Sequence, residues 1–274
     1  MSSCRSRPAA SGRCWGDPVK PVPFRYERPG SVDEAVALLA EHGDEAKVLA
    51  GGQSLVPMLN MRLARPSVLV DVNRLPFGEV SREDGSWRVG ALVRQADRRL
   101  LEIPLLAECL PHVGHFVTRN RGTVGGSIAH ADAAAELPLA LTVLGGSVVT
   151  SAGRVVRAEE FFVTHFTTAL EPGELLVETV WPAGGPEHRY AFEETAQRHG
   201  DFALSMAAAA AGPEGLRVAV GSVVDRPTLL AVDPDRPGES AAEQVEPWGS
   251  LHASADYLRH LTRVLVDRVV ERVT

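Results

Sequence analysis

The first third of the chain alternates hydrophobic and polar positions in a way that predicts a strand, a helix and a second strand. Large and charged residues alternate over 24–29, as in a short strand. Ser31 then begins a helix that Gly43 ends, with an apolar stripe between them. Residues 47–50 read as the next strand, and the glycine-rich turn 50–55 follows it. Strand–helix–strand units bind ligands at the carboxyl ends of their strands, so this turn is a candidate site.

The middle of the chain is predicted to surround one long, small-residue stretch, residues 119–138. We expect helices over 94–101 and 105–113 before this stretch and a helix over 134–144 after its glycines. Apolar and β-branched runs predict strands at 68–72, 87–91, 147–150, 154–156 and 175–180. The last three strands are expected to form a sheet that covers the glycine-rich stretch.

Proline and glycine between Trp181 and Pro186 mark the clearest boundary in the chain, because neither residue continues regular structure easily. We therefore expect a first domain over 21–183 and a smaller second domain over 186–274. Three antiparallel strands are predicted in the second domain, at 189–192, 202–211 and 216–224. The segment 233–248 reads as a polar connection, and an amphipathic helix is expected from Ser254 onward. The predicted fold class is α+β.

Composition narrows the class of protein further. The 274 residues are 45% hydrophobic, which is enough for a substantial core. The net charge of −7, with both signs mixed along the chain, argues against a nucleic-acid or anionic-membrane partner. No run of about 18 apolar residues occurs, so no membrane span is predicted.

Residues 1–20 are rich in Ser, Pro, Gly and Arg and have no apolar segment, so we expect a disordered leader and not a secretory signal. Cys4, Cys14 and Cys109 are too scattered for a disulfide framework, and they form no CxxC pair for zinc or an iron–sulfur cluster. This cysteine usage fits a reducing cytoplasm.

Two glycine-rich loops carry the candidate chemistry. The stretch 119–138, RNRGTVGGSIAHADAAAELP, combines Gly122, Gly125 and Gly126 with hydroxyl residues. Glycines let main-chain N–H groups converge on a phosphate. Together with the turn 50–55, this indicates one long ligand with two phosphates. On this interpretation Gly125→Val places methyl groups where a phosphate oxygen approaches, and it should abolish ligand retention while leaving the fold largely intact.

Five motifs in one order resemble a known family. They are AGGQSLVPM at 50–58, RNRGTVGGS at 119–127, AHAD at 129–132 continuing to Leu137-Pro138, GDFA at 200–203, and HASADY at 252–257. Together they resemble the FAD-binding medium subunit of bacterial molybdenum hydroxylases, the family of aerobic carbon monoxide dehydrogenase and xanthine dehydrogenase. The resemblance covers residues 23–274.

The resemblance implies an FAD-binding domain of the vanillyl-alcohol-oxidase or PCMH type, made of two α/β subdomains. A small C-terminal domain of the carbon monoxide dehydrogenase flavoprotein type would follow. Both loops would clasp the FAD pyrophosphate, Glu136 would meet the ribose or adenosine end, and Val113 would pack on the cofactor. The implied cofactor-binding residues are Ala50, Gly51, Gly52, Gln53, Ser54, Leu55, Val113, Thr123, Gly125, Gly126, Ser127, Ala129, Asp132 and Glu136. No catalytic residue is assigned.

The resemblance also implies a function. A large molybdopterin-binding subunit would oxidise the substrate, a small subunit would relay electrons through [2Fe-2S] clusters, and the flavin of this chain would pass them to a quinone, NAD or oxygen. Many family members carry a lysine near the flavin where this chain has Glu193, Glu194 and Thr195, and a carboxylate there would disfavour an anionic reduced flavin.

Rival functions stay open at this point. One is a free-standing FAD-dependent dehydrogenase or oxidase that acts directly on a small metabolite. Another is a cofactor-free scaffold that binds a partner through the former flavin cleft.

Rival roles also stay open for several residues. His112, His115, His130 and Asp132 have the chemistry of metal ligands, although we predict no metal. Asp132 could act as a general base, or it could cap a helix beginning at Ala133. Tyr190 and Phe192 could stack on the flavin or lie in the core.

Overall fold

The structure is a computed structural model that describes residues 20–274. The predicted leader, apart from Lys20, lies outside the described residues, as do Cys4 and Cys14. No described helix combines the length and the apolar character that crossing a bilayer requires.

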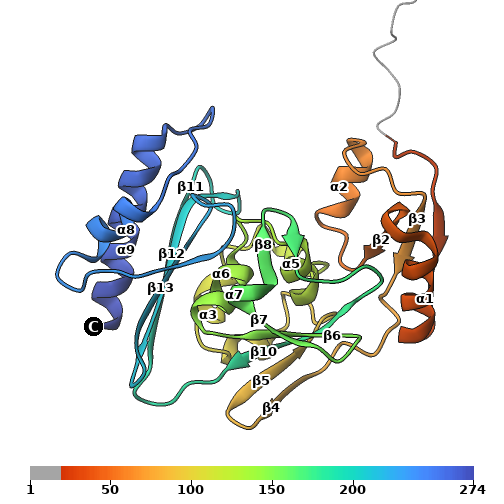
Figure 1. The fold of residues 1–274 in the computed structure, drawn as a ribbon, viewed down its shortest axis with the longest axis horizontal. Coiled ribbons are helices and arrows are strands. Elements are labelled where there is room, and N and C mark those ends of the chain that lie inside the picture. The colour runs from red at the N-terminus through yellow and green to blue at the C-terminus, as the bar shows by residue number, and fades with distance from the viewer. Residues whose placement is uncertain (1–19) are drawn as a thin grey trace, which may run out of the picture.

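The predicted strand–helix–strand opening is confirmed as one side of the molecule (Figure 1). Strands β1 (Arg25–Glu27), β3 (Val68–Asp71) and β2 (Ala46–Leu49) form a parallel sheet in that order. Helix α1 (Val32–His42) packs on β2 and β3, and the Ser31 side chain caps it by accepting from Glu34 N–H. The first glycine loop follows β2 and leads into the short helix α2 (Leu55–Asn60).

The middle of the molecule is a five-stranded antiparallel sheet with helices packed on it. Its order is β4 (Val80–Glu83), β5 (Ser86–Gly90), β10 (Leu176–Pro182), β6 (Ser147–Thr150) and β7 (Val155–Arg157). Helices α5 (Val124–His130), α6 (Glu136–Val143) and α7 (Ala158–Phe161), and a hairpin of β8 (Phe162–Thr164) and β9 (Thr167–Thr168), complete this part. β4 and the hairpin were not predicted.

The two helices predicted before the glycine-rich stretch are much shorter in the structure. Residues 98–102 form a 3₁₀ helix, η2 (Arg98–Glu102), and α3 covers only Leu106–Cys109, with α4 (Phe116–Arg119) beyond it. Proline explains both limits. Pro104 keeps Ile103 extended, with ψ of 125°, and Pro111 comes two residues after α3 ends.

The predicted small antiparallel sheet is confirmed, with one strand more than expected. β11 (Arg189–Ala196), β12 (Ala203–Gly212), β13 (Gly215–Gly221) and β14 (Thr228–Leu230) follow one another in order. The polar connection contains an unpredicted helix, α8 (Pro237–Gln244), and the chain ends in the predicted long helix α9 (Ala255–Val273).

The alanine run of β12 is buried on both faces. Ala207 and Ala209 pack in a core with residues of α9, whereas Met206, Ala208 and Ala210 belong to the core that includes α5 and α6. Small side chains are therefore required because another layer presses on each face of the strand. The second sheet is consequently fixed against the rest of the molecule by a shared core.

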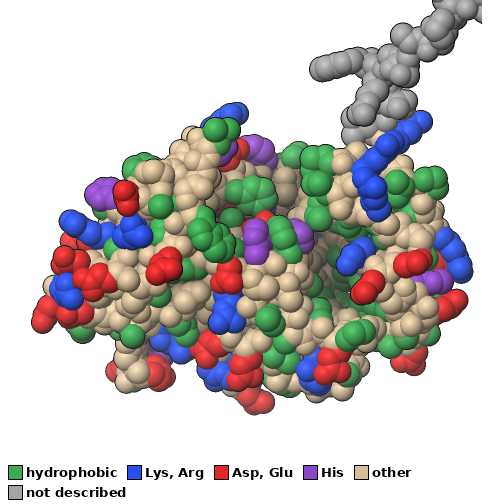
Figure 2. Space-filling view, turned by 45° about the horizontal axis from the view of Figure 1, so that its top comes forward, with side chains coloured by type: hydrophobic (Ala, Val, Ile, Leu, Met, Phe, Trp, Pro, Cys, Tyr) green, Lys and Arg blue, Asp and Glu red, His purple; other side chains and the backbone are tan. Residues whose placement is uncertain are grey.

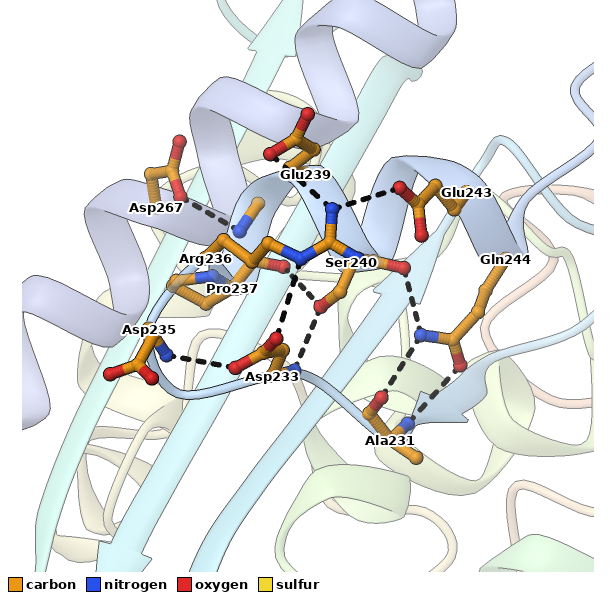
Figure 3. A network of polar contacts seen from close by, with 11 residues as sticks. Ala231, Asp233, Asp235, Arg236, Pro237, Glu239, Ser240, Glu243, Gln244 and Asp267 are labelled. Atoms are coloured by element: carbon orange, nitrogen blue, oxygen red, sulfur yellow. Dashed lines mark hydrogen bonds and ion pairs between the residues drawn. The ribbon is translucent and has the colours of Figure 1, made fainter.

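A polar network fixes α8 between β14 and α9 (Figure 3). Arg236 lies within 3.5 Å of the carboxylates of Asp233, Glu239 and Glu243. Gln244 both donates to Ala231 O and accepts from Ala231 N–H. Arg236 provides no side-chain cap for α8, and Asp267 of α9 takes that place by accepting from Gly238 N–H at 2.7 Å.

Gly238 lies where α8 packs tightly against α9, because a Cβ there would lie 2.2 Å from Arg263 O. Gly238→Ala is expected to force the two helices apart, destabilising the protein by about 1–3 kcal/mol, the usual cost of overpacking. Urea unfolding measures this. Gly185→Ala is the control, since a Cβ there meets only ordinary contacts; equal unfolding midpoints for both variants would contradict the prediction.

Candidate cofactor-binding site

The two glycine loops are in direct contact. A Cβ on Gly51 would lie 2.4 Å from Arg121 O and 2.8 Å from Gly122 Cα, so only glycine permits this approach. The sequence-predicted loops, about 70 residues apart along the chain, thus form one continuous surface.

An Asn–Arg pair that the sequence analysis missed joins the loops. Asn73 Nδ2 donates to Ala50 O at 2.8 Å, and Arg94 donates to Asn73 Oδ1 at 2.8 Å and to Arg121 O at 2.5 Å. Asn73 is in turn held by Asp71 Oδ1 at 2.6 Å. Asn73 follows the buried strand β3 and lies at the carboxyl end of the parallel sheet, which is the only signal in the sequence that could have indicated it.

Asp71 anchors this pair and is ionised. Burial would raise its pKa, but hydrogen bonds from the Tyr26 hydroxyl and from Asn73 outweigh burial, so the pKa of Asp71 lies below its ordinary value. Arg28 Nε, 3.5 Å away, adds a favourable charge. The anchor therefore keeps its negative charge at neutral pH.

The loops differ in the backbone N–H groups that they offer. Within the described chain, the N–H groups of residues 51–54 donate to no protein acceptor. At the start of α5, by contrast, Val124 N–H donates to Val93 O, Gly125 N–H to Ala91 O and Gly126 N–H to Thr123 Oγ1, all at 2.9–3.0 Å. The expectation that both loops present amides therefore fits the first loop, while in the second loop the N–H groups of residues 124–126 are engaged by the protein itself.

A cleft that is open to solvent lies beside Ala50 of the first loop and beside Gly125 and Gly126 of the second. Four predicted cofactor residues line it: Ala50, Gly125, Gly126 and Ala129. Most of the other residues that line it are apolar. They come from β2, from β10 and from segments next to β3, β5, β9 and β10: Val48, Val72, Phe77, Ala91, Leu92, Leu170, Leu175 and Leu176. One charged residue, Glu174, also lines it, and hydrogen bonds from Arg154 lower the pKa of Glu174 to about 2. An apolar cleft with a few convergent polar groups is typical of a cofactor site.

The remaining predicted residues lie around these loops. Gln53 and Ser54 are exposed, Leu55 is half-buried, and Thr123 caps α5. Ser127 is half-buried within α5, and Val113 is buried in the core. Asp132 accepts from Ala134 N–H at 2.9 Å in the turn before α6, so it does not cap a helix at Ala133, because α6 begins only at Glu136.

The four candidate metal ligands do not form one cluster in the described part of the chain. His112 pairs with Glu194, while Asp132 lies 3.4 Å from His165. Among residues 20–274 no three His, Cys, Asp or Glu side chains converge as a metal site would require. Phe192 is buried in the core, and Tyr190 is half-buried beside His188.

Glu136 is a buried carboxyl at the start of α6. Burial raises its pKa to about 8, the carboxylates of Glu194 and Asp132 add to the rise, and Arg119 offsets it only in part. A buried acid is costly to the fold, and such groups concentrate at functional sites. This burial agrees with a role for Glu136 toward a ligand.

Glu193 and Glu194, which replace the lysine expected from the resemblance, face opposite sides of β11. Glu193 lies 3.1 Å from Arg272 of α9, whereas Glu194 turns toward His112. Strand alternation causes this separation. Only Glu194 therefore belongs to the side of the sheet that faces the predicted FAD-binding part.

Gly125→Val was expected to leave the fold largely intact because its methyl groups would point at a phosphate oxygen. The structure contradicts that reason, since the added side chain would meet Ala91. A Cβ at the buried Gly125 would lie 2.5–2.8 Å from the Cβ, Cα and O atoms of Ala91, so this glycine is needed for α5 to pack on the segment after β5. We expect Gly125→Val to lower the free energy of unfolding by about 3 kcal/mol or more. Thermal unfolding of the FAD-free variant tests this, with wild-type stability as the contradicting result.

The fold, the paired loops and the cleft define a flavoprotein of the PCMH-type class. The free N–H groups of the first loop suit the pyrophosphate of FAD, and the apolar cleft wall suits its ring systems. Residues 22–184 match the family described as "FAD binding domain in molybdopterin dehydrogenase". The chain belongs to this family, and it is an FAD-dependent oxidoreductase.

Relatives with known names are similar over nearly the whole chain. The 6-hydroxypseudooxynicotine dehydrogenase complex subunit alpha of Paenarthrobacter nicotinovorans is 36% identical, covering 93% of this chain and 95% of the relative. The carbon monoxide dehydrogenase medium chain of Hydrogenophaga pseudoflava is 34% identical, with coverages of 91% and 96%. The crystal structure of quinoline 2-oxidoreductase from Pseudomonas putida 86 superposes with a TM-score of 0.85 at 37% identity, covering 93% of this chain and 98% of that one.

These findings confirm the family, the fold class and FAD as cofactor. They leave the individual FAD contacts and the domain boundaries as predictions. Because the chain belongs to an FAD-binding family, the hypothesis of a cofactor-free scaffold is excluded.

Proposed function

We propose that this chain is the flavoprotein subunit of a molybdenum hydroxylase complex. In this proposal it takes electrons from a molybdopterin-binding large subunit through a [2Fe-2S] small subunit and passes them to an external acceptor. The observation that carries the proposal is similarity over at least 90% of the chain to proteins named as a complex subunit and as a medium chain. Among the described residues Cys109 is the only cysteine and it is buried, so this part of the chain offers no cluster ligands.

FAD would be held mainly by the first loop. The unpaired N–H groups of residues 51–54 would donate to the pyrophosphate, and charge-assisted bonds of this kind contribute about 1.5–3 kcal/mol each. Thr123 and Ser127 would add hydroxyl groups to this pyrophosphate site. Gly126, which has no side chain, would let the second loop lie close to the cofactor. When bound, the isoalloxazine ring supplies the electron chemistry, and the protein orients it and excludes water.

The molecular surface is consistent with a protein partner and not with nucleic acid. Acidic and basic side chains are intermixed on the face drawn in Figure 2, and the net charge is −7. We propose 21–183 as the FAD-binding domain and 186–274 as the second domain, and we propose a cytoplasmic location.

Anaerobic reduction separates this function from its alternative. The purified chain with FAD is mixed with candidate substrates, first alone and then with co-expressed large and small subunits, and flavin absorbance near 450 nm is followed. Bleaching only in the complex is expected. Bleaching of the isolated chain would favour the free-standing dehydrogenase instead. Reoxidation by a quinone, NAD or oxygen then identifies the acceptor.

A further inference from the structure

Glu194 has a carboxylate oxygen that the protein leaves without a partner. Its side chain is only 4% exposed, and Oε1 lies 3.0 Å from His112 Nδ1. The other oxygen, Oε2, is buried and has no hydrogen-bond donor among the described residues. Leaving a buried acceptor unpaired is unfavourable, so a donor from outside the chain is expected to satisfy it.

Glu194 lies among residues that the proposed function places near the flavin. His112 is adjacent to Val113, the position expected to pack on the cofactor. Glu136, expected at the ribose or adenosine end, is close enough that the Glu194 charge raises its pKa. The orphan oxygen is thus associated with two proposed FAD contacts that belong to different elements.

The groups around Glu194 have opposing effects on its pKa, so a further hydrogen-bond donor is expected to favour the ionised form. Burial raises its pKa, and His112, before α4, and His199, after β11, act against that rise. Glu136 on α6 and Cys109 on α3 complete the titratable groups near it, and burial raises the pKa of both. His112 holds one oxygen and leaves the other free.

We propose that Glu194 is a positioning residue for the flavin, with Oε2 accepting a hydrogen bond from bound FAD. This inference rests on the proposed FAD site. The cofactor would complete the His112–Glu194 pair and so tie the strand β11 to the first domain. Among the described residues, only His112 lies within reach of this carboxylate as a donor, and it reaches Oε1 alone.

The proposal has a pH dependence with a definite sign. A hydrogen bond donated by FAD favours the ionised carboxylate, so binding releases a proton wherever the free protein still holds it. FAD affinity should therefore increase as pH rises through the titration of Glu194 and then level off. The charge also opposes formation of an anionic reduced flavin, so its removal should raise the flavin midpoint potential.

The test compares Glu194→Gln with Glu193→Gln in the full-length FAD-free chain. FAD is titrated by fluorescence quenching over a pH series, and the midpoint potential is measured for the loaded proteins. Glu194→Gln is expected to weaken binding about tenfold at high pH, flatten the pH dependence and raise the potential. Glu193→Gln changes a neighbouring carboxyl that faces Arg272, and it should match the wild type.

The outcomes separate this inference from the proposed function. Failure of the wild type to bind FAD would overturn the proposed site. Normal wild-type binding, with the same affinity, pH profile and potential in Glu194→Gln, would overturn only the role of Glu194. Circular dichroism establishes that the variant folds; if it does not, a wild-type FAD affinity that fails to rise with pH overturns the inference by itself.

Discussion

Gly51→Ala is expected to weaken FAD binding by about two orders of magnitude while the hydrophobic cores stay intact. The added Cβ would lie 2.4 Å from Arg121 O, where ordinary contacts begin near 3.4 Å, and the obstructing atoms are backbone. The two loops must therefore separate by about an ångström, and misplacement of that size costs on the order of 10²-fold at a preorganised site. The measurements are the ratio of bound flavin to protein and the FAD dissociation constant.

Gly78→Ala is the matched control for this variant, because a Cβ at Gly78 meets nothing within 4 Å. It should bind FAD as the wild type does. Thermal unfolding of the FAD-free proteins separates a local effect from general destabilisation. Undiminished affinity in Gly51→Ala would show that contact between the loops is not needed for binding.

Glu136→Gln is expected to stabilise the FAD-free protein strongly at alkaline pH. An unfolded chain has an ordinary glutamate, with a pKa of 4.5, but burial raises the pKa of Glu136 to about 8 in the fold. Between these values the folded state binds more protons, so stability is complete below pH 4.5 and falls as pH rises to 8. The neutral glutamine avoids this loss, giving roughly 2–4 kcal/mol at pH 8.

Above pH 8, where Glu136 is mostly ionised, the same substitution should also weaken FAD binding, because the proposed acceptor for a ribose hydroxyl loses its charge. Urea unfolding at pH 4 and pH 8 and FAD titration test the two effects. Glu79→Gln, at a side chain that is 93% exposed, should change neither. A stability gain that is equal at both pH values would contradict the pKa assigned to Glu136.

Several elements could be predicted because their signals are local. The Ser31 cap, the strands on either side of α1, the glycine loops and the amphipathic α9 each depend on residues only a few positions apart. Prediction failed for α8, where a proline-containing polar segment becomes helical through contacts with Asp267 and with Ala231, which follows β14. It also failed for the three-residue strand β14, whose pairing with β13 is set by the sheet.

The amino-acid sequence by itself determined the family, the FAD cofactor and the two loops, since glycine spacing and motif order are properties of the chain. Tertiary structure decided which loop has free N–H groups, because the acceptors of the second loop, Val93 O and Ala91 O, lie on a segment 31–34 residues earlier. It also decided that Glu194 is buried while Glu193 reaches Arg272. Hydrogen-bond partnership and burial depend on which distant segments meet, and no local pattern specifies that meeting.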